Sequence, residues 1–150
     1  MKGQVSTELL VVVALVLLIF IPLLVMVYMK ANEADQQIGS YQAELAVSRI
    51  VSIANSVGSL GTNTSVTTDV YIPPNTVSFD TRQAGAGSEI VLTLRTAQGN
   101  TETSDIVRYP MKSPGPIAQN LMPGGYMKIR ISSTTSPGGN AVITIEPAQQ

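Results

Sequence analysis

The chain has 150 residues and a formal net charge of −1, which fits one modest domain with an additional segment rather than two full domains. It has no cysteine, which excludes disulfides, and no histidine, which removes the commonest general base and metal ligand. The near-neutral charge gives no general attraction for nucleic acid. We therefore expect neither an enzyme nor a nucleic-acid partner, and no cofactor or metal.

An apolar run dominates the N-terminal part of the chain. It extends from Leu9 to Met29, 21 residues without a charge. As a helix it would span about 31 Å, close to the hydrocarbon thickness of a bilayer. Its sixteen Leu, Ile, Val and Phe residues favour insertion by roughly 5 to 10 kcal/mol, against about 3 kcal/mol for burying Glu8. Pro22 is tolerated, with a kink, in a transmembrane helix. The run therefore predicts a transmembrane helix.

This run allows two other interpretations. A conventional secretory signal peptide has an apolar region of about 7 to 15 residues that ends at a small-x-small cleavage site. This run is longer and ends in VYMKANEAD, which offers no convincing site of that kind. A plain uncleaved anchor fits the run as well, with Glu8 as an ordinary flanking charge.

The residues before the apolar run favour one kind of membrane segment over the others. KGQVSTELL closely resembles the class III signal peptide of archaeal type IV pilin-like proteins, which is a short basic leader, a Gly, and then Gln-x-Ser-x-Glu. Lys2 and Gly3 match the end of the leader, Gln4 the first mature residue, Ser6 the serine and Glu8 the acidic residue. The resemblance covers about ten residues.

This resemblance implies processing and assembly. A prepilin peptidase would cut between Gly3 and Gln4, so that residues 1–3 are a cleaved leader and the helix stays on the mature protein. The new amine of Gln4 would then pair with Glu8 of its own or a neighbouring subunit. Physics supports such a pair, because an amine or a carboxylate buried alone is costly.

The resemblance also implies a function and partners. The chain would be a structural subunit of an archaeal type IV-like adhesion pilus, built from copies of itself by a pilus assembly ATPase and a membrane platform protein. It would lie in the cell membrane as a precursor and then in the extracellular pilus. The alternatives are a minor or tip pilin, a pseudopilin, and a single-pass membrane-anchored extracellular binding domain.

Helical periodicity continues beyond the apolar run, so we expect one long helix over residues 4–58, ended by Gly58 and Gly61. One apolar stripe on this helix is predicted to pack against the β-domain. It comprises Ile38, Tyr41, Leu45, Ala46, Ile50, Ile53 and Val57.

Residues 61–150 have a different composition, rich in Thr, Ser, Gly and Pro. Alternating residues predict six strands, over residues 65–72, 75–81, 89–96, 104–111, 125–132 and 141–147. A hairpin loop is expected at residues 97–102. The fold class is therefore α+β, a long helix with a small antiparallel β-sandwich or barrel packed on the stripe.

Two features of this domain are interpreted in two ways each. Residues 110–125 form a long Pro/Gly-rich loop, either a subunit contact or outward-facing surface, or a plain connection. Asn63 opens the only N-x-S/T sequon, which is either an N-glycan site on an exported face or a chance match.

Overall fold

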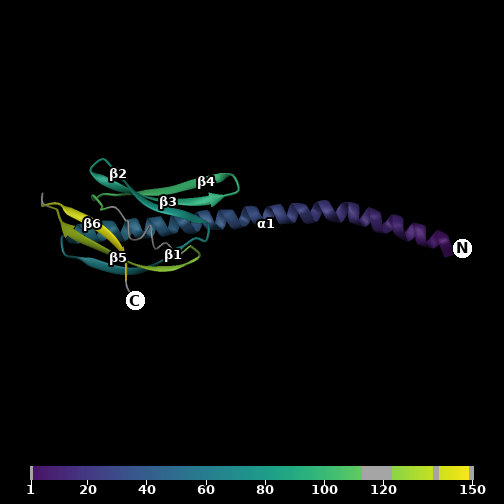
Figure 1. Cartoon of the computed structure of the whole chain (residues 1–150), viewed down its shortest axis with the longest axis horizontal. Helices are drawn as coiled ribbons and strands as arrows, with labels where there is room; N and C mark the ends of the chain where they lie inside the picture. The colour runs from purple at the N-terminus through teal and green to yellow at the C-terminus, as the bar shows by residue number, and fades with distance from the viewer. Residues whose placement is uncertain (1, 113–122, 137–138, 149–150) are drawn as a thin grey trace. The chain divides into compact units, whose positions relative to one another are not determined.

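The structure, a computed structural model, describes residues 2–112, 123–136 and 139–148, with side chains from Thr7 onward. One helix, α1 (Lys2–Leu60), precedes six strands (Figure 1). The chain divides into two compact units, Met1–Gln37 and Ile38–Gln150. The predicted α+β class, with a long N-terminal helix and antiparallel sheets, is confirmed.

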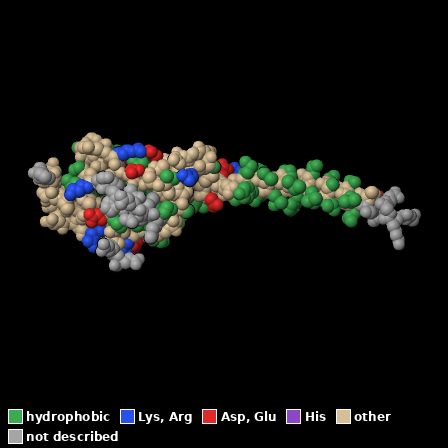
Figure 2. Space-filling model, in the orientation of Figure 1, with side chains coloured by type: hydrophobic (Ala, Val, Ile, Leu, Met, Phe, Trp, Pro, Cys, Tyr) green, Lys and Arg blue, Asp and Glu red, His purple; other side chains and the backbone are tan. Residues whose placement is uncertain are grey.

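The first unit is the N-terminal part of α1. Its large apolar side chains between Leu9 and Met29 are all 46–73% exposed, and Figure 2 shows them covering the helix surface. The helix continues through Pro22. It is long and apolar enough to cross a membrane, with a mean hydropathy of 3.4 over its most apolar window of 18 residues. Nothing within this unit removes these side chains from solvent.

The second unit holds two antiparallel three-stranded sheets. In one sheet the order is β1-β5-β6, formed by β1 (Ser65–Ile72), β5 (Gly125–Thr135) and β6 (Ala141–Pro147). In the other the order is β2-β3-β4, formed by β2 (Thr76–Ala84), β3 (Gly87–Thr96) and β4 (Gly99–Val107). No ladder joins these two sheets in the described part of the chain, so they are two separate sheets and do not close into a barrel.

A single hydrophobic core joins both sheets to the C-terminal part of α1. Ile90, Leu92 and Leu94 of β3 alternate into it, as the period of two in that strand predicts. Ile131 of β5 and Ile145 of β6 enter from the other sheet. Figure 1 shows the two sheets on either side of this part of the helix.

The helix face in this core differs from the predicted stripe. The buried helix residues are Ala43, Ala46, Val47, Ile50, Val51, Ala54 and Val57. Ile38, Tyr41 and Leu45, which were expected on the same face, are 54%, 65% and 71% exposed. At about 100° per residue these three lie on the side opposite Ala43 and Val47, so the predicted stripe merged two faces of the helix.

The end of the helix also differs from the prediction. Gly58 lies within α1, which ends at Leu60, and Gly61 follows with a φ of 97° that suits a glycine after a helix. Gly58 has a packing role instead, since a Cβ there would overlap the ring of Tyr109. The chain after β4 can therefore approach the helix closely at this point.

The strand predictions need correction at two points. The β3–β4 hairpin turns tightly at residues 97–98, so β4 begins at Gly99 and ends at Val107, against the expected residues 104–111. In β2 an irregularity in the ladder between Thr76 and Ser78 leaves Val77 44% exposed, although strict alternation placed it with buried Phe79. Of the predicted loop at 110–125, residues 113–122 lie outside the described residues.

Candidate processing and assembly site

The residues of the candidate cleavage site lie at the start of α1. Lys2, Gly3 and Gln4 are helical in their backbone and lie in the first described turn of α1. Backbone at a helix end lacks four intrahelical N–H partners and opens easily. The bond between Gly3 and Gln4 lies within this first described turn.

Glu8 follows Gln4 by four residues, so both lie on one face of the helix about one turn apart. The Glu8 side chain is exposed, beside Thr7, Val11 and Val12. The next cationic side chain that the structure describes is Lys30, which is about 33 Å further along the helix.

The surroundings of Glu8 define what this carboxylate needs. It stands at the head of an apolar run that is long and apolar enough to cross a membrane and so to be covered by lipid. A carboxylate covered in this way needs a partner of opposite charge. Without one, the free energy lost by removing the carboxylate from water is not compensated. An amine created at Gln4 by cleavage would be a cation of the right sign one turn away.

The far end of the apolar run is marked by an ion pair. Lys30 Nζ lies 2.7 Å from Glu33 Oε2, one turn along the helix. The hydrogen bond between them raises the pKa of Lys30 and lowers the pKa of Glu33. Both groups are exposed and stay charged at neutral pH, so the apolar run is bounded by charges at both ends.

Asn63 lies in the turn between α1 and β1. Its side chain is exposed and its φ is 65°, in the left-handed region that Asn tolerates better than most residues. Its backbone N–H donates to the Ser133 carbonyl over 2.9 Å, which holds the turn against β5. The amide of the sequon therefore faces solvent on a well-held turn and is open to a glycosylating enzyme.

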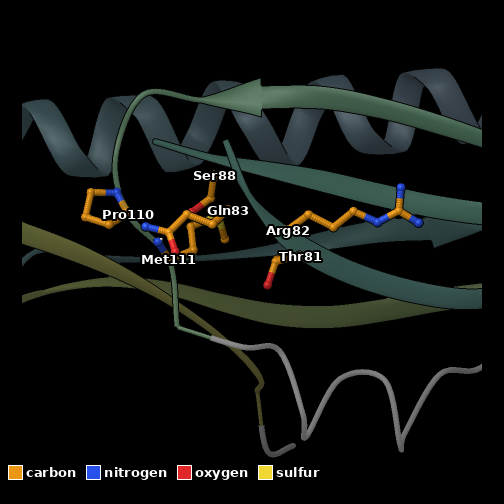
Figure 3. A pocket seen from close by; sticks show the side chains of 6 residues that line it. All are labelled: Thr81, Arg82, Gln83, Ser88, Pro110 and Met111. Atoms are coloured by element: carbon orange, nitrogen blue, oxygen red, sulfur yellow. Dashed lines mark hydrogen bonds between the residues drawn. The ribbon is translucent and has the colours of Figure 1, made fainter. Parts of the chain in front are cut away.

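A hollow in the second unit is the next candidate for a small-molecule site (Figure 3). It measures about 260 Å³ and is lined by Thr81, Arg82, Gln83, Ser88, Pro110 and Met111. Ser88 is buried, but its hydroxyl accepts the Met111 N–H over 2.9 Å, and the sequence has no histidine to activate it.

Arg82 does not turn this hollow into an anion site. Its guanidinium makes two 2.8 Å hydrogen bonds to Glu102, and Figure 3 shows it extending away from Pro110 and Met111. The pair lowers the pKa of Glu102 and raises that of Arg82. Among the described residues no group of acidic side chains could hold a metal ion.

One surface escaped the sequence analysis. Leu45 of α1, Tyr71 of β1 and Tyr126 of β5 line a hollow of about 280 Å³ on the second unit, and the two rings pack edge to face at 5.3 Å. Tyr126 is 76% exposed. Alternation along the strands does not reveal this surface, because only the pairing of β1 with β5 brings the two tyrosines together.

Comparison of the chain with protein-family models, curated proteins and solved structures finds no match.

Proposed function

We propose that the chain is a structural subunit of an archaeal type IV-like pilus. The observation that carries the proposal is the sequence Lys2-Gly3-Gln4-x-Ser6-x-Glu8 placed directly before an apolar, exposed run on one continuous helix. A plain anchor needs the run but has no use for this motif. The motif and the run together describe a helix that is released from a short leader and then moves between two environments.

The apolar run suits both environments. Its side chains are apolar on every side of the helix, so lipid and the helices of other subunits solvate it about equally well. Transfer from bilayer to filament then costs little solvation energy, because lipid tails and packed aliphatic side chains are similarly apolar. The same segment thus serves as membrane anchor in the precursor and as filament core in the pilus.

The role of Glu8 follows from its position. In the membrane it lies at the edge of the apolar run, where a charge is tolerated. In a filament it would be covered, and the amine at Gln4 of the same or a neighbouring subunit would neutralise it. If neighbouring subunits were shifted along the filament axis so that Glu8 and the amine did not meet, two unpaired charges would be buried at a cost in free energy. The pair therefore favours the one axial arrangement of subunits in which the two groups meet.

The β-domain would form the outer sheath of the pilus. Its surface is rich in Ser and Thr, and only 13% of the residues of the chain are charged, which suits an extracellular coat. Adhesion to surfaces is the activity that the pilin resemblance implies. A glycan on exposed Asn63 would add to this coat.

The N-terminus of the mature protein tests the proposal. Mass spectrometry of subunits from sheared filaments should find Gln4 as the first residue, with a free amine. Gly3→Val should abolish this cleavage by placing a branched side chain at the bond, whereas Val5→Ala, on the other side of it, should leave cleavage intact.

Imaging of the cell surface completes this test. Filaments that contain the chain are expected, and they separate a pilin from a monomeric anchored binding domain. An intact Met1 or Lys2 in assembled material, a first residue beyond Met29, or a complete absence of filaments would contradict the proposal.

A further inference from the structure

The exposed side of α1 carries a regular apolar seam. Between residues 30 and 49, positions spaced alternately by three and four residues are occupied by Ala31, Ala34, Ile38, Tyr41 and Leu45. The charged residues of this segment all fall elsewhere, and they are Lys30, Glu33, Asp35, Glu44 and Arg49. This is the spacing at which two helices pack side by side in a coiled coil. It is informative here because the segment is otherwise polar.

The β-domain leaves the large side chains of the seam exposed. Ile38, Tyr41 and Leu45 are 54%, 65% and 71% exposed, while the opposite side of the helix forms the core of the second unit. Three large apolar side chains in a row on a folded domain mark an interaction site. The seam ends after Leu45, because Ser48 and Ser52 occupy the next two positions.

The residues flanking the seam identify the partner. One flank carries Lys30, Gln37 and Glu44, and the other carries Asp35, Gln42 and Arg49. In two parallel, unstaggered helices, a residue on the first flank meets the residue five positions later on the other helix.

In two copies of this chain, the rule pairs Lys30 with Asp35, Gln37 with Gln42, and Glu44 with Arg49. Two pairs are of opposite charge and the third joins two amides, so no pair is repulsive. The pattern is complementary to itself, as a contact between two copies requires.

We propose that two copies of the chain pair through this seam, parallel and unstaggered, in the membrane before assembly. The inference rests on the proposed membrane insertion of Leu9–Met29, because identical apolar runs in one bilayer are held parallel and at the same depth. That constraint supplies the alignment that the charge pattern requires.

A hydrogen bond within the chain fixes the position of Arg49, one of the residues that would form this contact. Its Nη2 donates to the Thr68 hydroxyl of β1 over 3.1 Å, which positions the guanidinium beside the seam. Glu44 is exposed and makes no ion pair within the described residues. Tyr71 and Tyr126 line a hollow with Leu45 and Arg49, which widens the apolar surface on this flank.

Disulfide cross-linking tests the pairing, since the chain has no cysteine of its own. Tyr41→Cys places a thiol on the seam, and Asn32→Cys places an exposed thiol on the opposite side of the helix. Each full-length variant is oxidised with copper phenanthroline in membranes from which filaments have been sheared. We expect the Tyr41→Cys dimer to form about tenfold faster than the Asn32→Cys dimer, because a disulfide requires Cα atoms within about 7 Å.

The alignment has its own test in the Tyr41→Cys background. Glu44→Arg should slow the cross-linking reaction several-fold, because it places two positive charges together where Glu44 met Arg49 of the second copy. Adding Arg49→Glu should restore the rate, because the pair is again of opposite charge with the two residues exchanged. The restored rate also shows that the variants are folded.

Equal rates at positions 41 and 32, no effect of Glu44→Arg, no rescue by the double exchange, or a cross-link to a different protein would each overturn the pairing. Filament imaging and N-terminal processing are scored separately in the same cells. Normal filaments without the cross-link refute the pairing alone, and a cross-link without filaments refutes the pilus proposal alone.

Discussion

Glu8 is the residue on which the proposed function depends most. It is exposed at the head of an apolar run, and the nearest described cation lies at the far end of that run. Solvent satisfies the carboxylate in an isolated chain, but lipid tails and the apolar runs of neighbouring helices offer it no counter-charge. Under the proposed function, the residue would make assembly depend on the counter-charge created by cleavage before Gln4.

Glu8→Gln is expected to leave insertion and cleavage intact and to impair filament assembly. Insertion is spared because removing the charge makes the segment more apolar, by about 3 kcal/mol at most. Assembly suffers because the amine of Gln4 is buried without its partner, which typically costs about 3 to 5 kcal/mol at each subunit added. The measurement is the amount of subunit in the membrane fraction against the amount in sheared filaments.

Glu33→Gln is the matched control, since it also removes one negative charge from α1 but lies beyond the apolar run. It should assemble like the unaltered chain. A normal filament yield from Glu8→Gln would remove the assembly role of Glu8 even if the chain is a pilin.

At the scale of elements, the segment after β4 connects the helix to both sheets. Asn55 of α1 accepts the Arg108 N–H over 2.9 Å, and the Tyr109 ring covers Gly58. Ile143 of β6 then exchanges backbone hydrogen bonds with this segment, donating to Pro110 and accepting from Lys112. The close approach at Gly58 thus fixes how the two sheets are joined across the helix.

Gly58→Ala should destabilise the domain although alanine is the better helix former. The added methyl overlaps the Tyr109 ring, and overpacking of this kind costs about 1 to 3 kcal/mol, against a helix-propensity gain of up to about 1 kcal/mol. The control is Ser52→Ala, at an exposed position of the same helix, which should leave the melting temperature unchanged or slightly raised. Thermal unfolding of the detergent-solubilised chain measures both.

Tyr109→Ala makes the test specific. In that background the ring is gone, so adding Gly58→Ala should cost nothing further. An equal loss of stability from Gly58→Ala with and without the ring would show that the glycine serves another purpose.

At the scale of the whole molecule, the two compact units differ in where their apolar side chains lie. Every residue of the hydrophobic core lies in the second unit, from Ala43 onward, while the exposed apolar run lies in the first. The second unit therefore holds the hydrophobic core, and under the proposed function the first unit would contact lipid and other copies.

A chain beginning at Lys30 should accordingly fold and remain soluble. Removing the apolar run takes away no core contact, and circular dichroism should show mixed helix and strand with a cooperative thermal transition. A chain that begins at Ala54 is the control, because it loses the helix residues of the core and should not fold. An unfolded or wholly helical fragment from Lys30 would contradict this division.

The sequence by itself determined the elements whose pattern is local. The run from Leu9 to Met29, the strand with Ile90, Leu92 and Leu94 facing inward, and the α+β order follow from periodicity and length, which act within a few residues. The motif around Gln4 and Glu8 is equally local, and so it was visible without a structure.

Tertiary structure alone decided which helix face is buried. Ile38, Tyr41 and Leu45 are as apolar as the buried residues, and only the placement of two sheets on the other side of α1 leaves them exposed. The sequence alone does not predict which helix face is buried in the domain. An apolar side chain indicates that the position favours burial, but this holds equally for burial within its own domain and for burial against another copy.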